Sequence, residues 1–385
     1  MHAQRTIEVL EALVGFDTTS RNSNLPLVEW VEAYLDRFGV PHERVPDAAG
    51  TKANLWATIG PPDVPGTILS GHTDVVPVDG QAWTSDPFRL TERNGRVYGR
   101  GAADMKGFDA CCLAAVPKMV AARLTRPIHL SFSYDEEVGC VGVRGIIARL
   151  ERTKVKPAAC FVGEPTEMGV VIGHKGQRAF RVAVHGKTCH SSLAPHGVNA
   201  VDYGARMIVK IREISDRLAR SGVRDPLYDV PHTTAVSGVV RGGAVLNIVP
   251  DLCTFEFEFR PLAADDVDGL VEEVVTFARE RLEPEMQAVD PAARIVFEPK
   301  SSWPGLETPA ALDVVGLAKT LAGRNAYSKV AFGTEAGLFA AAGIPTVVIG
   351  PGSIDQAHKA DEYVAVAQLE ACSAFLDRLT AHSCA

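Results

Sequence analysis

The hydrophobic positions in the first 176 residues change repeatedly between helical spacing and short apolar runs. Helical spacing covers residues 4–14, 26–38, about 106–123 and about 141–151. The apolar runs cover residues 54–60, 66–74, 127–137 and 158–166. Because strands that alternate with helices usually form one layer covered by those helices, this part of the chain predicts an α/β fold with a mixed, mostly parallel sheet.

The last quarter of the chain resumes the same alternation. Helical spacing returns near residues 309–322, 334–342 and 365–380, and an apolar run lies within residues 345–352. We therefore expect residues 1–176 and 301–385 to form a single domain.

Between these two parts the pattern of the chain is different. Strand-like alternation occupies residues 177–187, 233–243, 252–262 and 293–299, and helical spacing occupies residues 198–218 and 265–281. The resulting order β-α-β-β-α-β is that of a ferredoxin-like α+β layer. Residues 177–300 are therefore expected to form a small inserted domain that interrupts the first.

Composition agrees with a folded chain of two domains. A length of 385 residues exceeds what one core usually supports, and 46% hydrophobic with 22% charged residues is ordinary for a globular protein. The net charge of −8 argues against nucleic acid or an anionic membrane as partner. No apolar run approaches the roughly 18 residues of a membrane span.

The cysteines and the start of the chain bear on its compartment. The chain has eight cysteines without CxxC spacing, and residues 1–16 resemble an amphipathic helix without a cleavage site. We expect reduced thiols and a cytoplasmic protein.

Candidate chemistry is concentrated in five short motifs, each at the junction of an apolar run and a Gly- or Pro-marked turn. They are GHTDVVP (71–77), GRGAADMKG (99–107), DEEVG (135–139), VGEPT (162–166) and QAHKADEYV (356–364). Strand ends of a parallel sheet are where ligands bind, so the motifs are expected to converge.

Together the motifs supply the ligands of a centre with two divalent metal ions. Histidine nitrogen and carboxylate oxygen without thiolate suit zinc, cobalt or manganese. Two ions need a shared ligand, and a carboxylate has two oxygens, so Asp104 is predicted to bridge them. One ion would take His72 and Glu164, and the other Glu137 and His358.

Two further carboxylates in these motifs have other expected roles. Glu136 stands next to a ligand without being needed as one, so it is free to activate water as a general base. Asp74 follows His72 by two residues, on the same side of a strand, and is expected to fix the tautomer of that histidine.

The five motifs and their order make the chain similar to the dinuclear zinc deacylase and peptidase family. That family includes acetylornithine deacetylase, succinyl-diaminopimelate desuccinylase and glutamate-releasing carboxypeptidases. The similarity spans nearly the whole chain, and it is carried further by FDTTSRNSN near the start, by GHKG after VGEPT, and by GTEAG at 333–337.

The resemblance implies a catalytic domain with an inserted lid and dimerisation domain, two zinc (or cobalt) ions and a homodimer. It also implies that His190 stabilises the oxyanion from the other subunit, while Asn247 and Arg260 contact the substrate. The implied reaction is hydrolysis of an N-acyl amino acid, with N2-acetyl-L-ornithine, from arginine biosynthesis, as the expected substrate. Glu335 could then pair with the ornithine ammonium.

Several alternatives remain open at this point. The nearest competitor is succinyl-diaminopimelate desuccinylase, which shares every metal residue, and a related carboxypeptidase is a less favoured alternative. Glu335 could instead stabilise the start of the helix at 334–342 through its dipole. A non-catalytic metal-dependent binding protein is also compatible with the ligands. The spare carboxylate of Glu136 counts against it, since binding alone needs no base.

Overall fold

The computed structural model describes residues 2–385, with side chains from residue 4 onward. These residues divide into two compact units. The larger unit contains the chain up to His174, Leu306–Val330 and Thr334–Ala385, and the inserted unit contains Lys175–Gly305 and Ala331–Gly333. Within the described part of the chain, no helix is long and apolar enough to cross a bilayer.

The larger unit is built on a sheet of nine strands in the order β1-β2-β6-β3-β7-β15-β8-β13, with β14 paired to β8. Their bounds are β1 (His42–Pro46), β2 (Ala53–Ile59), β3 (Thr67–His72), β6 (Ile128–Ser133), β7 (Ala159–Val162), β8 (Val171–His174), β13 (Leu306–Glu307), β14 (Ser328–Val330) and β15 (Thr346–Val348). The central strands β6, β3, β7 and β15 run parallel, whereas β1, β2 and β13 pair in antiparallel fashion.

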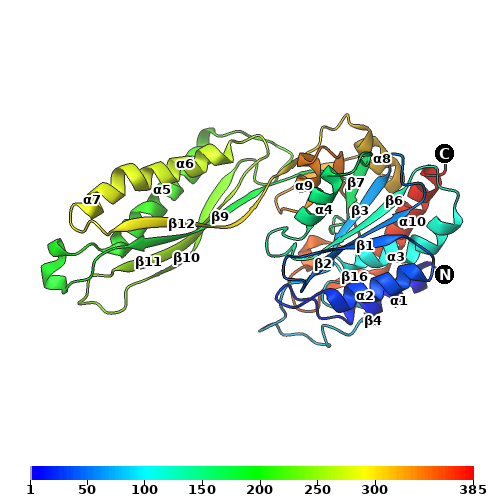
Figure 1. Cartoon of the computed structure of the whole chain (residues 1–385), viewed down its shortest axis with the longest axis horizontal. Coiled ribbons are helices and arrows are strands. Elements are labelled where there is room, and N and C mark those ends of the chain that lie inside the picture. The colour runs from blue at the N-terminus through cyan, green and yellow to red at the C-terminus, as the bar shows by residue number, and fades with distance from the viewer. Residues whose placement is uncertain (1) are drawn as a thin grey trace. The chain divides into compact units, whose positions relative to one another are not determined.

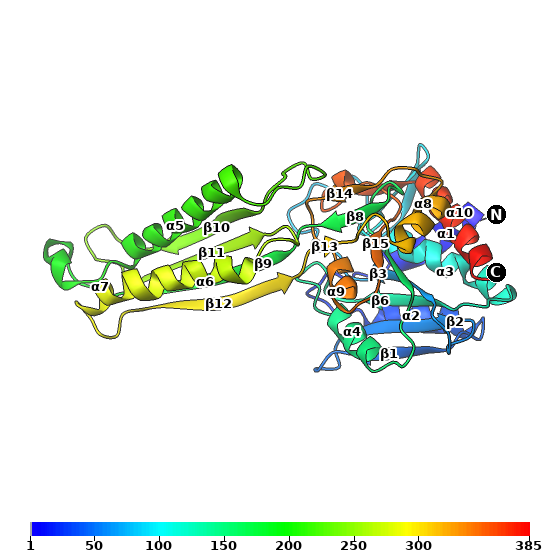
Figure 2. The ribbon, with the colours of Figure 1, turned by 90° about the horizontal axis from the view of Figure 1, so that it is seen from above.

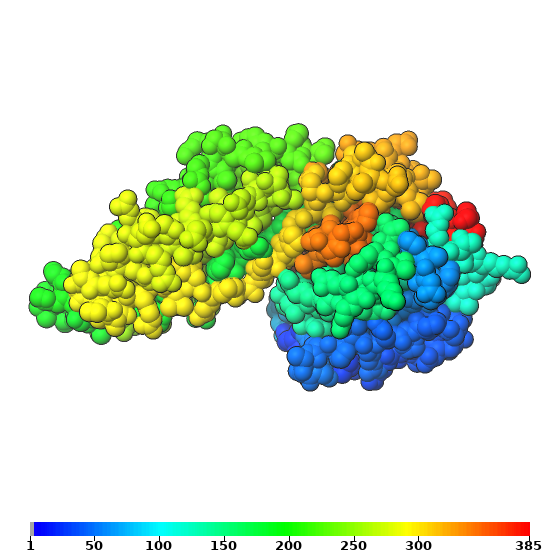
Figure 3. Space-filling model, turned by 45° about the horizontal axis from the view of Figure 1, so that its top comes forward, coloured from blue at the N-terminus to red at the C-terminus, as the bar shows by residue number. Residues whose placement is uncertain are grey.

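Helices cover both faces of this sheet (Figure 1). They are α1 (His2–Val14), α2 (Leu25–Asp36), α3 (Lys106–Ala121), α4 (Val143–Glu151), α8 (Asp313–Ala322), α9 (Ala336–Ala341) and α10 (Val366–His382). One core contains buried residues of α1, α2, α3, α8 and α10, and α4 packs against α9. In the space-filling view, α4 lies between the blue N-terminal segments and the orange segment of α9 (Figure 3). Burial on both faces explains why β7, with the sequence ACFV, is an apolar run. Strand β6 is buried just as completely but alternates apolar residues with His129, Ser131 and Ser133.

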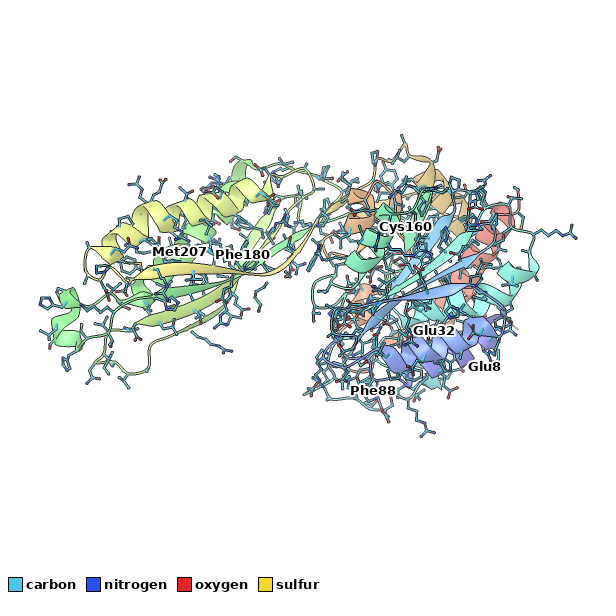
Figure 4. The ribbon with its side chains drawn as sticks, in the orientation of Figure 1. Glu8, Glu32, Phe88, Cys160, Phe180 and Met207 are labelled. Atoms are coloured by element: carbon cyan, nitrogen blue, oxygen red, sulfur yellow. The ribbon has the colours of Figure 1, made fainter. Side chains whose placement is uncertain are left out.

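The inserted unit is an antiparallel sheet in the order β10-β11-β9-β12, with α5 and α6 against one face (Figure 2). The elements are β9 (Gln177–His185), α5 (Ala200–Ser221), β10 (Thr234–Gly242), β11 (Leu252–Arg260), α6 (Val267–Phe277), α7 (Glu283–Gln287) and β12 (Arg294–Trp303). Buried phenylalanines alternate along β11 and pack with Met207 of α5, which Figure 4 labels beside Phe180 of β9.

The predicted fold class is confirmed: a mixed sheet covered by helices with an additional α+β layer. Some elements were not predicted. A small sheet of β4 (Thr91–Arg93), β5 (Arg96–Tyr98) and β16 (Tyr363–Ala365) had no apolar run, because its first hairpin is mostly polar and turns at Asn94-Gly95. The helix predicted over 265–281 changes at residue 277 into a π-helical turn.

Candidate metal centre

The parallel strands place three of the motifs at one edge of the sheet. His72 ends β3 and pairs with Ser133, which ends β6, so the acidic loop 135–137 begins beside it. Glu164 follows the end of β7, the other parallel neighbour of β3. Gly163 permits this approach, because a side chain there would overlap the Phe108 ring.

The remaining two ligands come from loops. Asp104 precedes α3 (Lys106–Ala121) and His358 precedes β16 (Tyr363–Ala365). Nε2 of His72 lies 3.0 Å from Oδ1 of Asp104, and Nε2 of His358 lies 3.2 Å from Oδ2 of the same carboxylate. The two oxygens of Asp104 therefore face two different histidines.

Each histidine also has a second carboxylate nearby. Nε2 of His72 lies 3.9 Å from Oε1 of Glu164, and Nε2 of His358 lies 3.1 Å from Oε2 of Glu137. The structure thus brings together all five predicted ligands in two groups that share Asp104.

The cluster buries several carboxylates close together, which favours the binding of cations. Burial, together with the charge of nearby Asp104, raises the pKa of Glu137 to about 7 and that of Glu164 well above its ordinary value. His72, Glu136 and Glu164 form one group that could hold a metal ion, and His72, Asp104 and Glu137 form another. Buried carboxylates that converge in this way are stabilised when a divalent cation replaces their protons, and the N and O donors fit such an ion.

Glu136 is held beside the ligands by its backbone. Its amide donates to Oδ1 of Asp74 at 3.0 Å, and the Cys140 thiol donates to its carboxylate oxygen Oε1 at 3.3 Å. Burial raises the pKa of Glu136 to about 8, and the charge of Glu137 contributes to the increase. A carboxylate with a raised pKa next to a metal site can act as a general base and acid.

Asp74 contacts His72 differently from the expected way. Nδ1 of His72 lies 2.9 Å from the backbone carbonyl of Asp74 and 3.6 Å from its carboxylate. The carboxylate instead accepts from the amides of Glu136 and Glu137 and from the Ser20 hydroxyl. Asp74 therefore holds the acidic loop through its side chain and orients the histidine through its main chain.

Glu335 contacts strands β3 and β6 and belongs to neither group of possible metal-binding residues. Its side chain is 1% exposed and accepts from the hydroxyls of Ser70, 2.6 Å away, and Ser133, 2.8 Å away. Burial raises the pKa of this carboxyl to about 7. Helix α9 (Ala336–Ala341) begins directly after it but receives no capping bond from its side chain. These serine contacts were not anticipated from the sequence.

The inserted unit contains three residues predicted to contact the substrate, and it brings two of them, His190 and Asn247, together. His190 pairs with Ile248 in an isolated bridge, and the Ser191 amide donates to the carbonyl of Asn247 at 2.9 Å. The amide of Ser192 donates to Nδ1 of His190 at 3.2 Å, which leaves Nε2 to carry the ring proton.

Arg260 lies at the opposite end of β11 (Leu252–Arg260). This strand has nine residues, so its ends are about 27 Å apart at roughly 3.4 Å per residue. Asn247 precedes the first end and Arg260 occupies the last, where Nε donates to Oε1 of Glu258 at 3.0 Å. Within one inserted unit, Arg260 and the His190–Asn247 pair therefore do not share a site.

Two residues beside the centre were missed. Glu362 and Arg100 form a buried ion pair with a 2.7 Å Nη1–Oε2 distance, next to the loops of His358 and Asp104. The only signal was their place inside two motifs, and charged residues in a turn are usually solvated.

Comparisons with known proteins agree with this geometry. Residues 68–382 match the model of peptidase family M20/M25/M40. The chain is 36% identical to an acetylornithine deacetylase of Myxococcus xanthus, over 97% of this chain and 96% of that protein. It is 33% identical to the acetylornithine deacetylase of Proteus mirabilis, over 99% and 95%.

Solved structures show the same fold at lower identity. An aminopeptidase PepT from Bacillus cereus superposes with a TM-score of 0.76 at 22% identity, covering 100% of this chain and 99% of that one. A Bacillus subtilis protein described as a dinuclear metal binding peptidase gives 0.69 at 15% identity, covering 98% and 97%.

Proposed function

The chain belongs to the peptidase family M20/M25/M40, and we propose that this metal-dependent hydrolase converts N2-acetyl-L-ornithine and water to L-ornithine and acetate, a step of arginine biosynthesis. The observation that carries the proposal is the pair of histidines facing the two oxygens of Asp104, with Glu136 beside them. The names of the full-length relatives support the choice of substrate.

In this proposal, two zinc or cobalt ions would be held by His72 and Glu164 and by Glu137 and His358, with Asp104 between them. When bound, such ions polarise a carbonyl oxygen and make water more acidic. Glu136 removes a proton from the attacking water and then delivers it to the leaving amine, so that one carboxylate serves both steps.

The inserted unit supplies the polar groups that meet the substrate. With its proton on Nε2, His190 donates a hydrogen bond to the carbonyl oxygen as negative charge develops there. Arg260 binds the α-carboxylate, for which the planar guanidinium is suited, and Asn247 contacts the substrate beside His190.

We also propose that two copies form a homodimer through the inserted units. Strand β10 (Thr234–Gly242) is an edge strand with exposed valines, and Leu246, next to Asn247, is 100% exposed. Apolar residues on a free sheet edge favour pairing with another chain. A dimer would also explain the distance between Arg260 and His190, because each subunit would use its own Arg260 and its partner's His190.

A cytoplasmic location remains part of the proposal. All eight cysteines carry free thiols, and six of them are buried. Free thiols on this scale suit a reducing compartment.

The substrate proposal is tested with a small panel. Among N2-acetyl-L-ornithine, N-succinyl-diaminopimelate and N-acetyl-norleucine, we expect the highest kcat/KM for acetylornithine. A higher kcat/KM on the succinylated substrate would replace the proposal with a desuccinylase, and no hydrolysis of any amide by protein loaded with metal would favour a binding protein.

The same panel tests the expected pairing of Glu335 with the ornithine ammonium. If the carboxylate meets the side-chain cation, Glu335→Gln lowers kcat/KM for acetylornithine more than for the uncharged norleucine derivative, because a buried charge loses its partner. Equal losses on both substrates would assign Glu335 to the scaffold through its two serine contacts.

A further inference from the structure

Glu362 gathers four N–H donors around one buried carboxylate. Its Oε2 accepts from Nη1 of Arg100 at 2.7 Å and from the amide of Gly101 at 3.0 Å. Its Oε1 accepts from the amides of Ala103 at 2.8 Å and Asp104 at 3.0 Å. Glu362 is 1% exposed, so its contacts are with the protein and not with bulk solvent.

Arg100 extends these contacts toward His358. Its Nη2 donates to Oε1 of Gln81, and Nε2 of Gln81 donates to the backbone carbonyl of His358 at 3.0 Å. Nη1 of Arg100 also donates to the carbonyl of Lys359 at 3.3 Å. The chain of contacts therefore runs from the amide of Asp104 through Glu362, Arg100 and Gln81 to the carbonyl of His358.

The two residues at the ends of this series of hydrogen bonds, Asp104 and His358, both lie in loops. Contacts from other segments must therefore hold them in place. His358 has φ +63°, in the left-handed region that residues other than glycine adopt only at an energetic cost. Asp104 belongs to a loop before α3 (Lys106–Ala121), and neither the sheet ladder nor a helix fixes it. A buried ion pair such as Arg100–Glu362 is weak evidence for stability by itself, because desolvation offsets the attraction.

We propose that Glu362, Arg100 and Gln81 form a positioning clamp that holds the backbone of Asp104 against that of His358. The clamp would thereby set the geometry of the metal position assigned to His358 and Glu137, called here the second metal position. None of the three is a proposed ligand, and Glu362 acts on Asp104 through its amide. The inference rests on the proposed metal centre. Wild-type protein that bound fewer than two ions would contradict the metal centre itself. The clamp is tested separately, by comparing the metal affinities of the variants with those of wild type.

The test begins with Glu362→Gln in the full chain. The variant keeps the size and shape of the side chain, but one carboxylate oxygen becomes an NH2 group. That group faces two N–H donors and cannot accept from them, so the contacts on one side of Glu362 are lost. Titration calorimetry of metal-free protein with Zn²⁺ should show one ion bound as in wild type and the other about 10–100-fold more weakly, the usual effect of losing a partner behind a ligand. Excess Zn²⁺ should then restore kcat more than it alters KM.

A second measurement avoids the metal and activity altogether. In metal-free Glu362→Gln, amide hydrogen exchange should accelerate in the loop 99–105 and around residues 357–360, while the strand β3 (Thr67–His72) keeps its protection. Unchanged affinity for both ions, with or without a lower melting temperature, would make Glu362 a structural residue only and overturn the proposal.

Gln81→Ala tests the other end of the clamp. Gln81 is only half-buried, so its replacement should leave the fold intact even if Glu362→Gln does not accumulate. The variant should bind the ion at the second metal position more weakly than wild type does. Affinities equal to wild type for both ions would contradict the clamp. Glu370→Gln, an exposed carboxylate on α10 (Val366–His382), is the matched control and should bind both ions normally.

Discussion

Replacing Glu136 with Gln should lower kcat by about 10²–10⁴-fold, the usual contribution of a general base, while KM and metal content stay close to wild type. The reason is the position of this carboxylate beside the ligands, where the amide contact to Asp74 and the Cys140 thiol hold it. Its pKa of about 8 before metals bind reflects burial first and the charge of Glu137 among the further causes. Steady-state kinetics and metal analysis of the purified variant give both quantities.

The matched control is the neighbouring carboxylate. Glu137→Gln removes a proposed ligand 3.1 Å from His358 and should lose metal together with activity. If Glu136→Gln also loses metal in proportion to its activity, then Glu136 is a ligand and another residue must serve as base.

Mixing two inactive variants should restore activity if His190 works across a dimer. His190→Ala removes a donor to the developing oxyanion, a loss of about 10²–10³-fold, and Glu136→Ala removes the base. Random exchange makes half of the dimers mixed, each with one intact site, so an equal mixture should reach about a quarter of wild-type activity. Kinetics after subunit exchange provide the measurement.

Two observations make the mixing experiment decisive. Mass spectrometry under native conditions shows whether mixed dimers form, and a chain carrying both substitutions, mixed with His190→Ala, should recover nothing. Mixed dimers without recovered activity would mean that His190 acts within its own subunit or has no catalytic role.

The sequence contained most of the fold because burial left a periodic signal. Strand β7 is buried on both faces and is an apolar run, and Phe255, Phe257 and Phe259 mark the inward face of β11. The polar hairpin of β4 and β5 carries no such signal, because pairing through the backbone does not depend on apolar side chains.

The candidate site was predicted as a set of ligand types, while the contacts that support it were not. His72 and Asp104 are recognisable because their side chains carry the chemistry. By contrast, Glu362 acts on backbone amides, and Glu335 accepts from Ser70, which is distant in sequence. Such contacts depend on tertiary packing, which leaves no spacing rule in the chain.

A crystal structure of the protein loaded with zinc, with anomalous diffraction at the zinc edge, would test the proposed two-metal centre. We predict two peaks about 3.5–4 Å apart, with His72, Glu164, Glu137 and His358 each roughly 2.0–2.3 Å from one ion and one oxygen of Asp104 on each. A single ion, or His358 or Glu164 turned away from a filled site, would contradict the two-metal assignment.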